Sequence, residues 1–145
     1  MAITTSVITN SFKKELLEAT HNFSSGSGNS FKLALYTNSA TLGKSTTSFT
    51  TDNQVSNTGQ YTSGGGALTN GGTSLSTNTA IIDFADRSFT GVTLTARGAL
   101  IYNDTASGDP AVCVLDFGGD KSASSGTFTI QFPAFTSSAA ILRIT

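Results

Sequence analysis

The side chains best suited to catalysis in this 145-residue chain are its one histidine, His21, and its one cysteine, Cys113. Any Ser–His or Cys–His mechanism would have to use His21 as its base. His21 comes at the end of a predicted helix, where a protonated imidazole stabilises the helix dipole, so we interpret it as structural. Cys113 stands between Val112 and Val114, which predicts an inert thiol in the core. We therefore expect that the protein is not an enzyme.

Two further patterns could hold a phosphate group or a metal ion, and both are incomplete. Residues 42–46 read LGKST, like the end of a phosphate-binding loop, but Asn38 stands where the first glycine is required. The segment that follows is β-branched and polar, so no helix is predicted to direct its amides at a phosphate. Three acidic pairs stand near predicted turns: Asp83/Asp86, Asp104/Asp109 and Asp116/Asp120. They lack the alternating ligands of an EF-hand. The sequence also places no pair of carboxylates at the separation that glycoside hydrolysis needs. We expect neither a metal nor a cofactor.

The composition disfavours several classes of partner. Only 12% of the residues are charged, the formal net charge is −1, and Lys and Arg form no cluster. Nucleic acids and anionic membranes are bound by basic patches, so neither partner is expected. The first ten residues lack the basic and apolar regions of a signal peptide, and no apolar run approaches the roughly 18 residues of a membrane span. We expect a single domain, residues 1–145, synthesised in a cytoplasm.

The last third of the chain contains four apolar runs of strand length. Gly, Asp, Pro, Ser and Asn separate them, which predicts an antiparallel sheet joined by successive hairpins. The runs are GALIYN (98–103), AVCVLDF (111–117), TFTIQF (127–132) and AAILRI (139–144). The first two are apolar at odd and even positions alike, so both of their faces should be covered by other parts of the chain.

The first part of the chain predicts an arm, a helix and a strand. Residues 1–9 are β-branched and polar, which indicates an edge strand or a docking arm. Residues 10–23 predict a helix, capped by Asn10 or Ser11 and carrying one apolar face. Residues 31–37 read FKLALYT, and this alternation is typical of a strand with one buried face.

The polar middle of the chain, residues 38–79, predicts long surface loops and short edge strands. After it, residues 79–85 and 92–96 predict two strands joined by a turn at 86–88. Residues 115–122 resemble 82–88, since both segments read as strand, acidic turn, basic residue and returning strand, which suggests two like hairpins. The predicted fold class is mainly β: an antiparallel β-sandwich over residues 31–145, of which a jelly roll would be one form, with one N-terminal α-helix.

The arm and the polar middle are the expected contact surfaces for a partner. A β-branched arm could add a strand to a neighbour's sheet edge, and long loops often carry binding residues. The candidate partner-binding residues are Ile3, Val7, Ile8, Phe49, Val55 and Tyr61. The last three, with Leu68 and Leu75, are also spaced so as to anchor the loops in a core.

Several segments resemble a group of small structural proteins of tailed bacteriophages, especially marine ones. The segments are AITTSVITNSFKKELLEATHNF (2–23), FKLALYTNSATLG (31–43), TARGALIYN (95–103), AVCVLDFGGDK (111–121), GTFTIQFP (126–133) and ILRI (141–144). The resemblance implies a virion component, above all a decoration or cement protein on the capsid exterior. Its partner would be the major capsid protein, and by analogy with other decoration proteins it would be a homo-oligomer such as a trimer.

Three other readings stay open at this stage. A receptor- or glycan-binding module of a tail or head fibre would need aromatic platforms, for which Tyr36, Tyr61 and Tyr102 are the candidates. A neck or tail subunit would form a ring of fixed stoichiometry. A cytoplasmic enzyme is the least favoured reading, because it would depend on His21.

Overall fold

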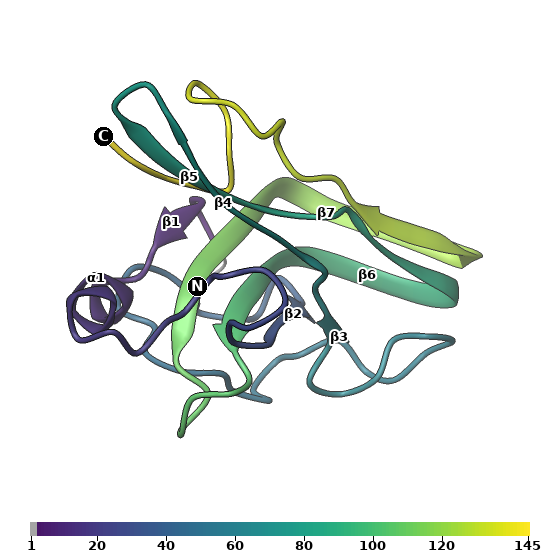
Figure 1. The fold of residues 1–145 in the computed structure, drawn as a ribbon. Coiled ribbons are helices and arrows are strands. Elements are labelled where there is room, and N and C mark those ends of the chain that lie inside the picture. The colour runs from purple at the N-terminus through teal and green to yellow at the C-terminus, as the bar shows by residue number, and fades with distance from the viewer. Residues whose placement is uncertain (1–2) are drawn as a thin grey trace.

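The computed structural model describes residues 3–145, so residues 1 and 2 of the predicted arm lie outside the described part. The fold is a sandwich-like pair of antiparallel sheets with one short helix, as predicted (Figure 1). The first sheet has the order β1 (Val7–Ile8), β7 (Ala111–Ile130), β6 (Arg87–Asn103), β2 (Phe31–Tyr36) and β3 (Gly66–Ala67). The second has the order β4 (Asn70–Ser76), β5 (Thr79–Phe84) and β8 (Leu142–Ile144), and the helix α1 spans Asn10–Leu17.

The long strands β6 and β7 pair with each other and form the largest part of the first sheet (Figure 1). Their register runs from Arg87 opposite Ile130 to Tyr102 opposite Ala111, with several irregularities along the way. The acidic turn predicted within 115–122 is therefore wrong, because these residues lie inside β7. Gly118 has a φ of +76°, so the residues that resemble a turn in the sequence serve an irregular stretch of strand instead. The suggested pair of like hairpins does not exist.

The first sheet is buried on both faces where residues 98–103 pair with 111–114, as predicted for these two runs, whereas residues 115–117 are half-buried. One face packs against the second sheet and the helix, which contribute Ile82, Phe84, Leu142 and Phe12. The opposite face is covered by Ile3 and Ala40, with the half-buried Val7, Leu42 and Phe49. The prediction of one buried face for 31–37 is wrong, since Ala34 and Tyr36 are also fully buried, beneath this arm and loop.

Helix α1 is shorter than the predicted helix 10–23, and its cap is one residue earlier. The Thr9 side chain accepts a hydrogen bond from the Phe12 amide, so Thr9 is the N-cap. The chain leaves the helix after Leu17, and Ala19 takes a left-handed φ of +58°. Phe23 then stacks on Phe31 with ring centroids 4.4 Å apart, so the predicted last helical turns are instead an irregular segment that buries His21 and Phe23. Within residues 3–145, no helix has the length and apolarity needed to cross a bilayer.

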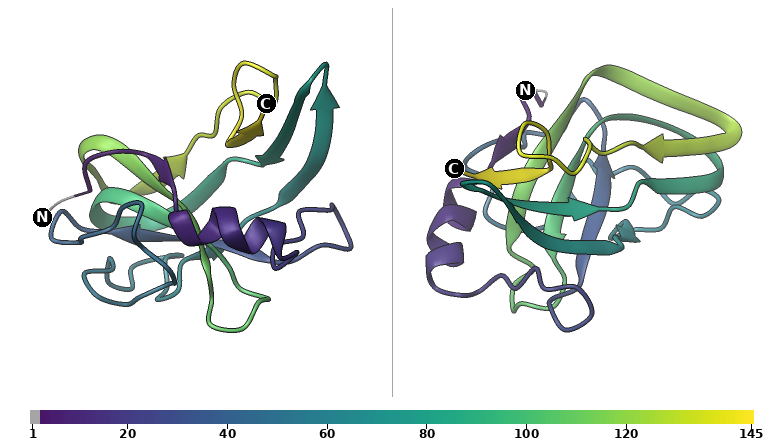
Figure 2. Two further views of the ribbon diagram at one scale, coloured as in Figure 1. Left: turned by 90° about the vertical axis from the view of Figure 1, so that its left-hand side faces the viewer. Right: turned by 45° about the horizontal axis from the view of Figure 1, so that its top comes forward.

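The second sheet is built from the end of the polar middle and the C-terminus. Strands β4 and β5 form a hairpin that rises away from the first sheet, with α1 below it in the left view of Figure 2. Strand β8 pairs with the other side of β5 and forms one edge of this sheet. The predicted strand at 139–144 is thereby confirmed only in its last three residues.

Candidate functional site

An apolar groove lies between α1 and the second sheet, with a volume of about 360 Å³. The helix contributes Phe12, Leu16 and Leu17 to its wall. The sheet contributes apolar side chains from two strands: Ala80, Ile82, Leu142 and Ile144. Its lining is almost wholly carbon, so the groove offers a ligand apolar contact and very few hydrogen-bonding groups.

The register of the second sheet explains why this surface is apolar. Ala80 of β5 lies opposite Leu75 of β4 and opposite Ile144 of β8, so the three side chains form one row on one face. The next row on that face contains Ile82 and Leu142, which are buried in the core. The core therefore covers the inner row, Ile82 and Leu142, and leaves the outer row uncovered. The outer row extends beyond it, and Leu75 and Ile144 are 72% and 59% exposed.

The helix side of the groove is also apolar at its rim. Leu17, the last residue of α1, is 90% exposed although Leu16 beside it is half-buried against the core. Leu17, Leu75 and Ile144 are three of the four large apolar side chains that are exposed among residues 3–145. Their concentration around one groove distinguishes this surface from scattered exposed side chains, which need no explanation.

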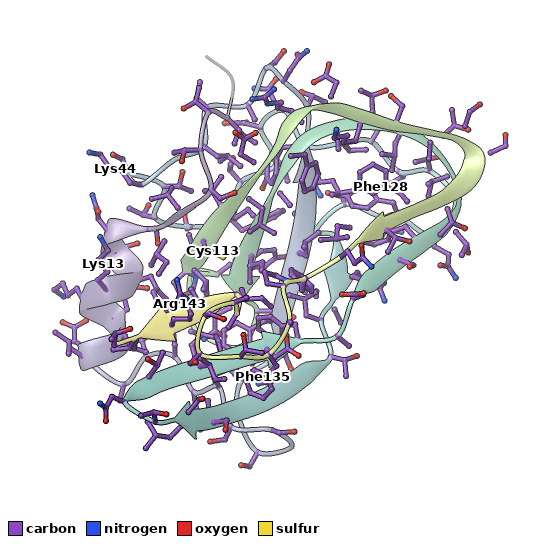
Figure 3. All side chains as sticks on the ribbon, turned by 90° about the horizontal axis from the view of Figure 1, so that it is seen from above. Lys13, Lys44, Cys113, Phe128, Phe135 and Arg143 are labelled. Carbon is purple, nitrogen blue, oxygen red and sulfur yellow. The ribbon has the colours of Figure 1, made fainter. Side chains whose placement is uncertain are left out.

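Two basic residues border the groove, Lys13 on α1 and Arg143 on β8 (Figure 3). Neither forms an ion pair within residues 3–145, whereas the neighbouring Lys14 pairs with Glu18. The Arg143 guanidinium donates to the Ser137 carbonyl over 2.9 Å, which leaves its charge without a carboxylate. Because Leu142 and Ile144 face the groove, the Arg143 side chain between them points to the other face of β8, and Lys13 is the one unpaired cation on the groove side.

His21 is buried and held in a structural network. Its Nε2 lies 2.7 Å from Oε2 of Glu15, and its Nδ1 lies 3.1 Å from the side-chain amide of Asn103. Oδ1 of Asn103 accepts from the amides of Thr105 and Ala106, so its NH₂ group must face the imidazole. Nδ1 of His21 is therefore an acceptor, and Nε2 carries the proton that Glu15 accepts.

The predicted position of His21 at a helix end is thus wrong, since α1 ends at Leu17 and the imidazole is packed among Phe12, Phe23 and Phe31. Within residues 3–145, no hydroxyl or thiol group is hydrogen-bonded to His21. Both ring nitrogens are already occupied by Glu15 and Asn103. The geometry supports the structural interpretation of this residue.

The other groups considered for chemistry are also enclosed. Burial raises the pKa of the Cys113 thiol to about 12, so almost no thiolate is present at neutral pH. In the loop at 42–46, the Gly43 amide donates to the Thr46 hydroxyl over 3.0 Å, so this amide is not free for a phosphate. Residues 3–145 contain no group of three or more His, Cys, Asp and Glu side chains that could hold a metal ion.

The six predicted partner-binding residues are mostly engaged within the chain. Ile3, Val55 and Tyr61 are buried, at 0%, 6% and 0% exposure. Val7 and Ile8 form β1, which pairs with Val114 and Cys113 of β7, so one side of the predicted docking arm is already occupied. Phe49 is half-buried and stacks on Tyr102 with ring centroids 4.7 Å apart. The structure brings only Ile8 to the apolar groove.

Most of the residues predicted to anchor the polar middle of the chain lie in the core, with one exception. Val55, Tyr61 and Leu68 all belong to the buried core, whereas Leu75 is exposed at the groove. The three candidate sugar platforms are buried as well, since Tyr36, Tyr61 and Tyr102 are at most 2% exposed. None of the three rings is available to stack on a sugar in this conformation.

Leu17, Leu75 and Ile144 are the site residues that the sequence reasoning missed. Each is apolar and stands in or beside a predicted helix or strand, which led to the expectation of a core position. In the sequence, the groove was indicated only by Lys13, which stands beside the apolar face of the predicted helix without an acidic residue three or four positions away. Comparisons of the chain with protein-family models, with curated proteins and with solved structures found no match.

Proposed function

We propose that this protein is a non-enzymatic binding protein that docks on a larger protein assembly through the apolar groove. The observation that carries the proposal is the concentration of Leu17, Leu75 and Ile144 around one groove of about 360 Å³. Apolar patches of this kind on soluble proteins commonly mark interaction sites, because leaving them in water is unfavourable. Covering them with a partner would remove that cost.

The assembly we propose is the capsid of a tailed bacteriophage, with this protein as a decoration or cement protein on its exterior. The segments that resemble phage structural proteins support this choice, and so does a surface that is rich in hydroxyl groups and low in charge. The partner would be the major capsid protein. Binding of many copies, or of a homo-oligomer such as a trimer, would multiply modest contacts through the symmetry of the shell.

The proposal is tested by comparing complete phage particles with particles that lack this protein. We expect the deficient particles to lose their DNA at a lower temperature and at low salt. Reconstruction of the complete particles should place hundreds of copies on the capsid lattice. Equal stability of the two particles would contradict the cementing role, and a handful of copies on a fibre, or a ring at the neck, would assign the protein to another part of the virion.

A matched pair of variants tests the groove itself. Leu17→Ser changes an exposed apolar side chain in the groove, and Phe135→Ser changes an exposed apolar side chain outside it. We expect added Leu17→Ser protein to bind deficient particles at least about tenfold more weakly than the Phe135→Ser protein. Equal binding of the two would show that the groove is not the docking surface.

A further inference from the structure

We propose that the groove and the free edge of β8 together bind an extended segment of a partner protein, in which acidic residues alternate with apolar ones. This inference rests on the proposed function, because it names the chemistry of the partner at the same groove. Three features carry it: the unpaired edge of β8, the apolar rows that end at this edge, and the charge of Arg143.

Strand β8 is an edge of the second sheet, and its outer side has no partner strand. Successive residues of a strand direct their amide and carbonyl groups to opposite sides, so pairing with β5 satisfies only some of these groups. Within residues 3–145, the backbone of β8 forms no other hydrogen bond. The opposite edge, β4, has an irregularity between Asn70 and Gly72, which hinders the addition of a strand, whereas the β5–β8 register is regular. The edge of β8 is therefore the one suited to receive a further strand.

The apolar rows of the sheet end at this edge. Leu142 continues the row of Ile82, and Ile144 continues the row of Leu75 and Ala80. A strand added beside β8 would place alternate side chains on the same face, next to Leu142 and Ile144. Apolar side chains at these places would extend both rows into the groove and would cover Ile144, which is 59% exposed.

The free edge distinguishes an extended segment from other occupants of an apolar groove. A helix bonds its own amides and carbonyls internally, so it would cover the apolar wall and leave the edge of β8 unpaired. A fatty acid would likewise contact the wall alone. An extended segment forms main-chain hydrogen bonds with an edge strand while its alternate side chains enter pockets, which is the strand-addition mode of peptide recognition.

Arg143 determines the charge of the segment. It lies between Leu142 and Ile144 on β8, so its side chain points to the face of the strand away from the groove (Figure 3). It is exposed, donates to the Ser137 carbonyl and has no carboxylate partner among residues 3–145. In an added strand, the residue between two groove-facing residues lies beside Arg143, where a carboxylate would compensate the charge. The complementary segment therefore reads apolar, acidic, apolar.

The same charge disfavours a second copy of this chain as the occupant. Antiparallel pairing of two β8 strands about Arg143 would place two guanidinium groups opposite each other, and like charges in this position are destabilising. The chain does contain apolar–acidic–apolar runs at 82–84 and 115–117. These runs already pair with β4 and β6, and their apolar side chains pack in or against the core. We therefore assign the complementary segment to a different protein.

The test uses the purified full chain and four synthetic peptides of about nine residues. One peptide alternates Val with Glu, and a second has Lys in place of each Glu. The other two are Val–Glu peptides N-methylated at one or the other alternate set of backbone amides, so only one of them loses the amides that face β8. Binding is measured by fluorescence anisotropy, and the contact site by amide chemical shifts of the labelled protein.

We expect the Glu peptide to bind about fivefold more tightly than the Lys peptide, with shifts in β8 and α1. One N-methylated peptide should bind at least tenfold more weakly than the other, because main-chain hydrogen bonds supply much of the affinity. The variant Arg143→Glu should prefer the Lys peptide. The control Lys121→Glu, an exposed site away from the groove, should keep the original preference.

Several results would overturn the inference. They are absence of binding at millimolar peptide, equal binding of the Glu and Lys peptides, and equal binding of the two N-methylated peptides. Binding of the peptide as a helix, tighter binding of dodecanoate than of the peptide, or dimerisation of the chain through β8 would each show that another occupant fits this surface.

This experiment fails independently of the particle experiment. If the peptides do not bind but the protein decorates capsids through the groove, only the chemistry of the partner is wrong. If the Glu peptide binds along β8 but the protein is absent from virions, the inference stands and the capsid assignment falls.

Discussion

The side-chain amide of Asn103 donates to Nδ1 of His21 over 3.1 Å, and this bond joins the end of β6 to the segment that follows α1. The same amide group lies 2.9 Å from Oδ1 of Asn29, and Oδ1 of Asn103 accepts from two backbone amides of the next loop. The Asn103 side chain is fully buried, so its amide group depends on these partners within the protein. The network fixes the position of the helix and hence one wall of the groove.

Replacing Asn103 with alanine should therefore destabilise the fold strongly. The change leaves Nδ1 of His21 and the backbone amides of Thr105 and Ala106 without these partners, and we expect a loss of about 3 kcal/mol in the free energy of unfolding. Urea unfolding followed by circular dichroism measures it. Asn38→Ala is the matched control, since the Asn38 side chain is exposed and bonds only to exposed Asp120, and it should cost less than about 0.5 kcal/mol. Equal effects of the two changes would contradict the role of this network.

Alkaline pH should unfold the protein cooperatively, because all three of its tyrosines are buried. Burial raises the pKa of Tyr36, Tyr61 and Tyr102 above the ordinary value of 10.0. Their pKa values are higher in the folded state than in the unfolded state, so their contribution to stability is complete below about pH 10 and is lost as the pH rises through the folded values. Tyrosinate absorbance should therefore appear together with the loss of circular dichroism. Ionisation of a tyrosine well before unfolding would show that its ring is accessible.

Cys113 should react with thiol reagents only when the protein opens. At pH 8 its pKa of about 12 leaves a thiolate fraction roughly 1,000-fold below that of an unfolded cysteine. Since it is the only cysteine, the labelling rate of the whole chain reports this one site. We expect the rate to rise with urea in parallel with the unfolded fraction. Rapid labelling in the absence of urea would reveal local opening of β7 near β1.

The sequence predicts the class of the fold because strand-length apolar runs and turn-forming residues act locally. The predictions are wrong where the same residue types can form two different structures. Gly118 and Ser125 indicated a turn, yet both take positive φ within the irregular part of β7. A bulge and a turn use the same residue types, so their composition does not distinguish them.

The burial of β2 and the apolar groove could not be predicted for a different reason. Tyr36 is buried because the arm and the loop that contains Phe49 return over it, which is a property of the tertiary structure. Leu75, Ala80 and Ile144 form one row only because β8 pairs with β5 from the far end of the chain. In the sequence, each of these three residues is simply an apolar residue in a predicted strand. The candidate site is therefore a product of strand register, which local patterns do not specify.

Gly98→Ala and Gly119→Ala form a matched pair that tests how closely the arm packs on β6. A Cβ atom added at Gly98 would lie 2.4 Å from the Leu115 carbonyl oxygen and 2.7 Å from Cδ1 of Ile3, whereas one at Gly119 would meet nothing within 4 Å. The β6–β7 pair must shift to accept the first change, so we expect Gly98→Ala to cost about 1–3 kcal/mol.

Gly119→Ala removes only the freedom of a glycine in the unfolded chain, so it should leave stability unchanged or raise it by up to about 1 kcal/mol. Thermal and urea unfolding of the two variants provide the comparison. The arm should also respond, because Nε of Arg97 donates to the Ile3 carbonyl over 3.1 Å next to Gly98. We expect faster amide exchange at Val7 and Ile8 in Gly98→Ala alone. If Gly98→Ala were as stable as Gly119→Ala, the close approach of Leu115 and Ile3 to Gly98 would be wrong.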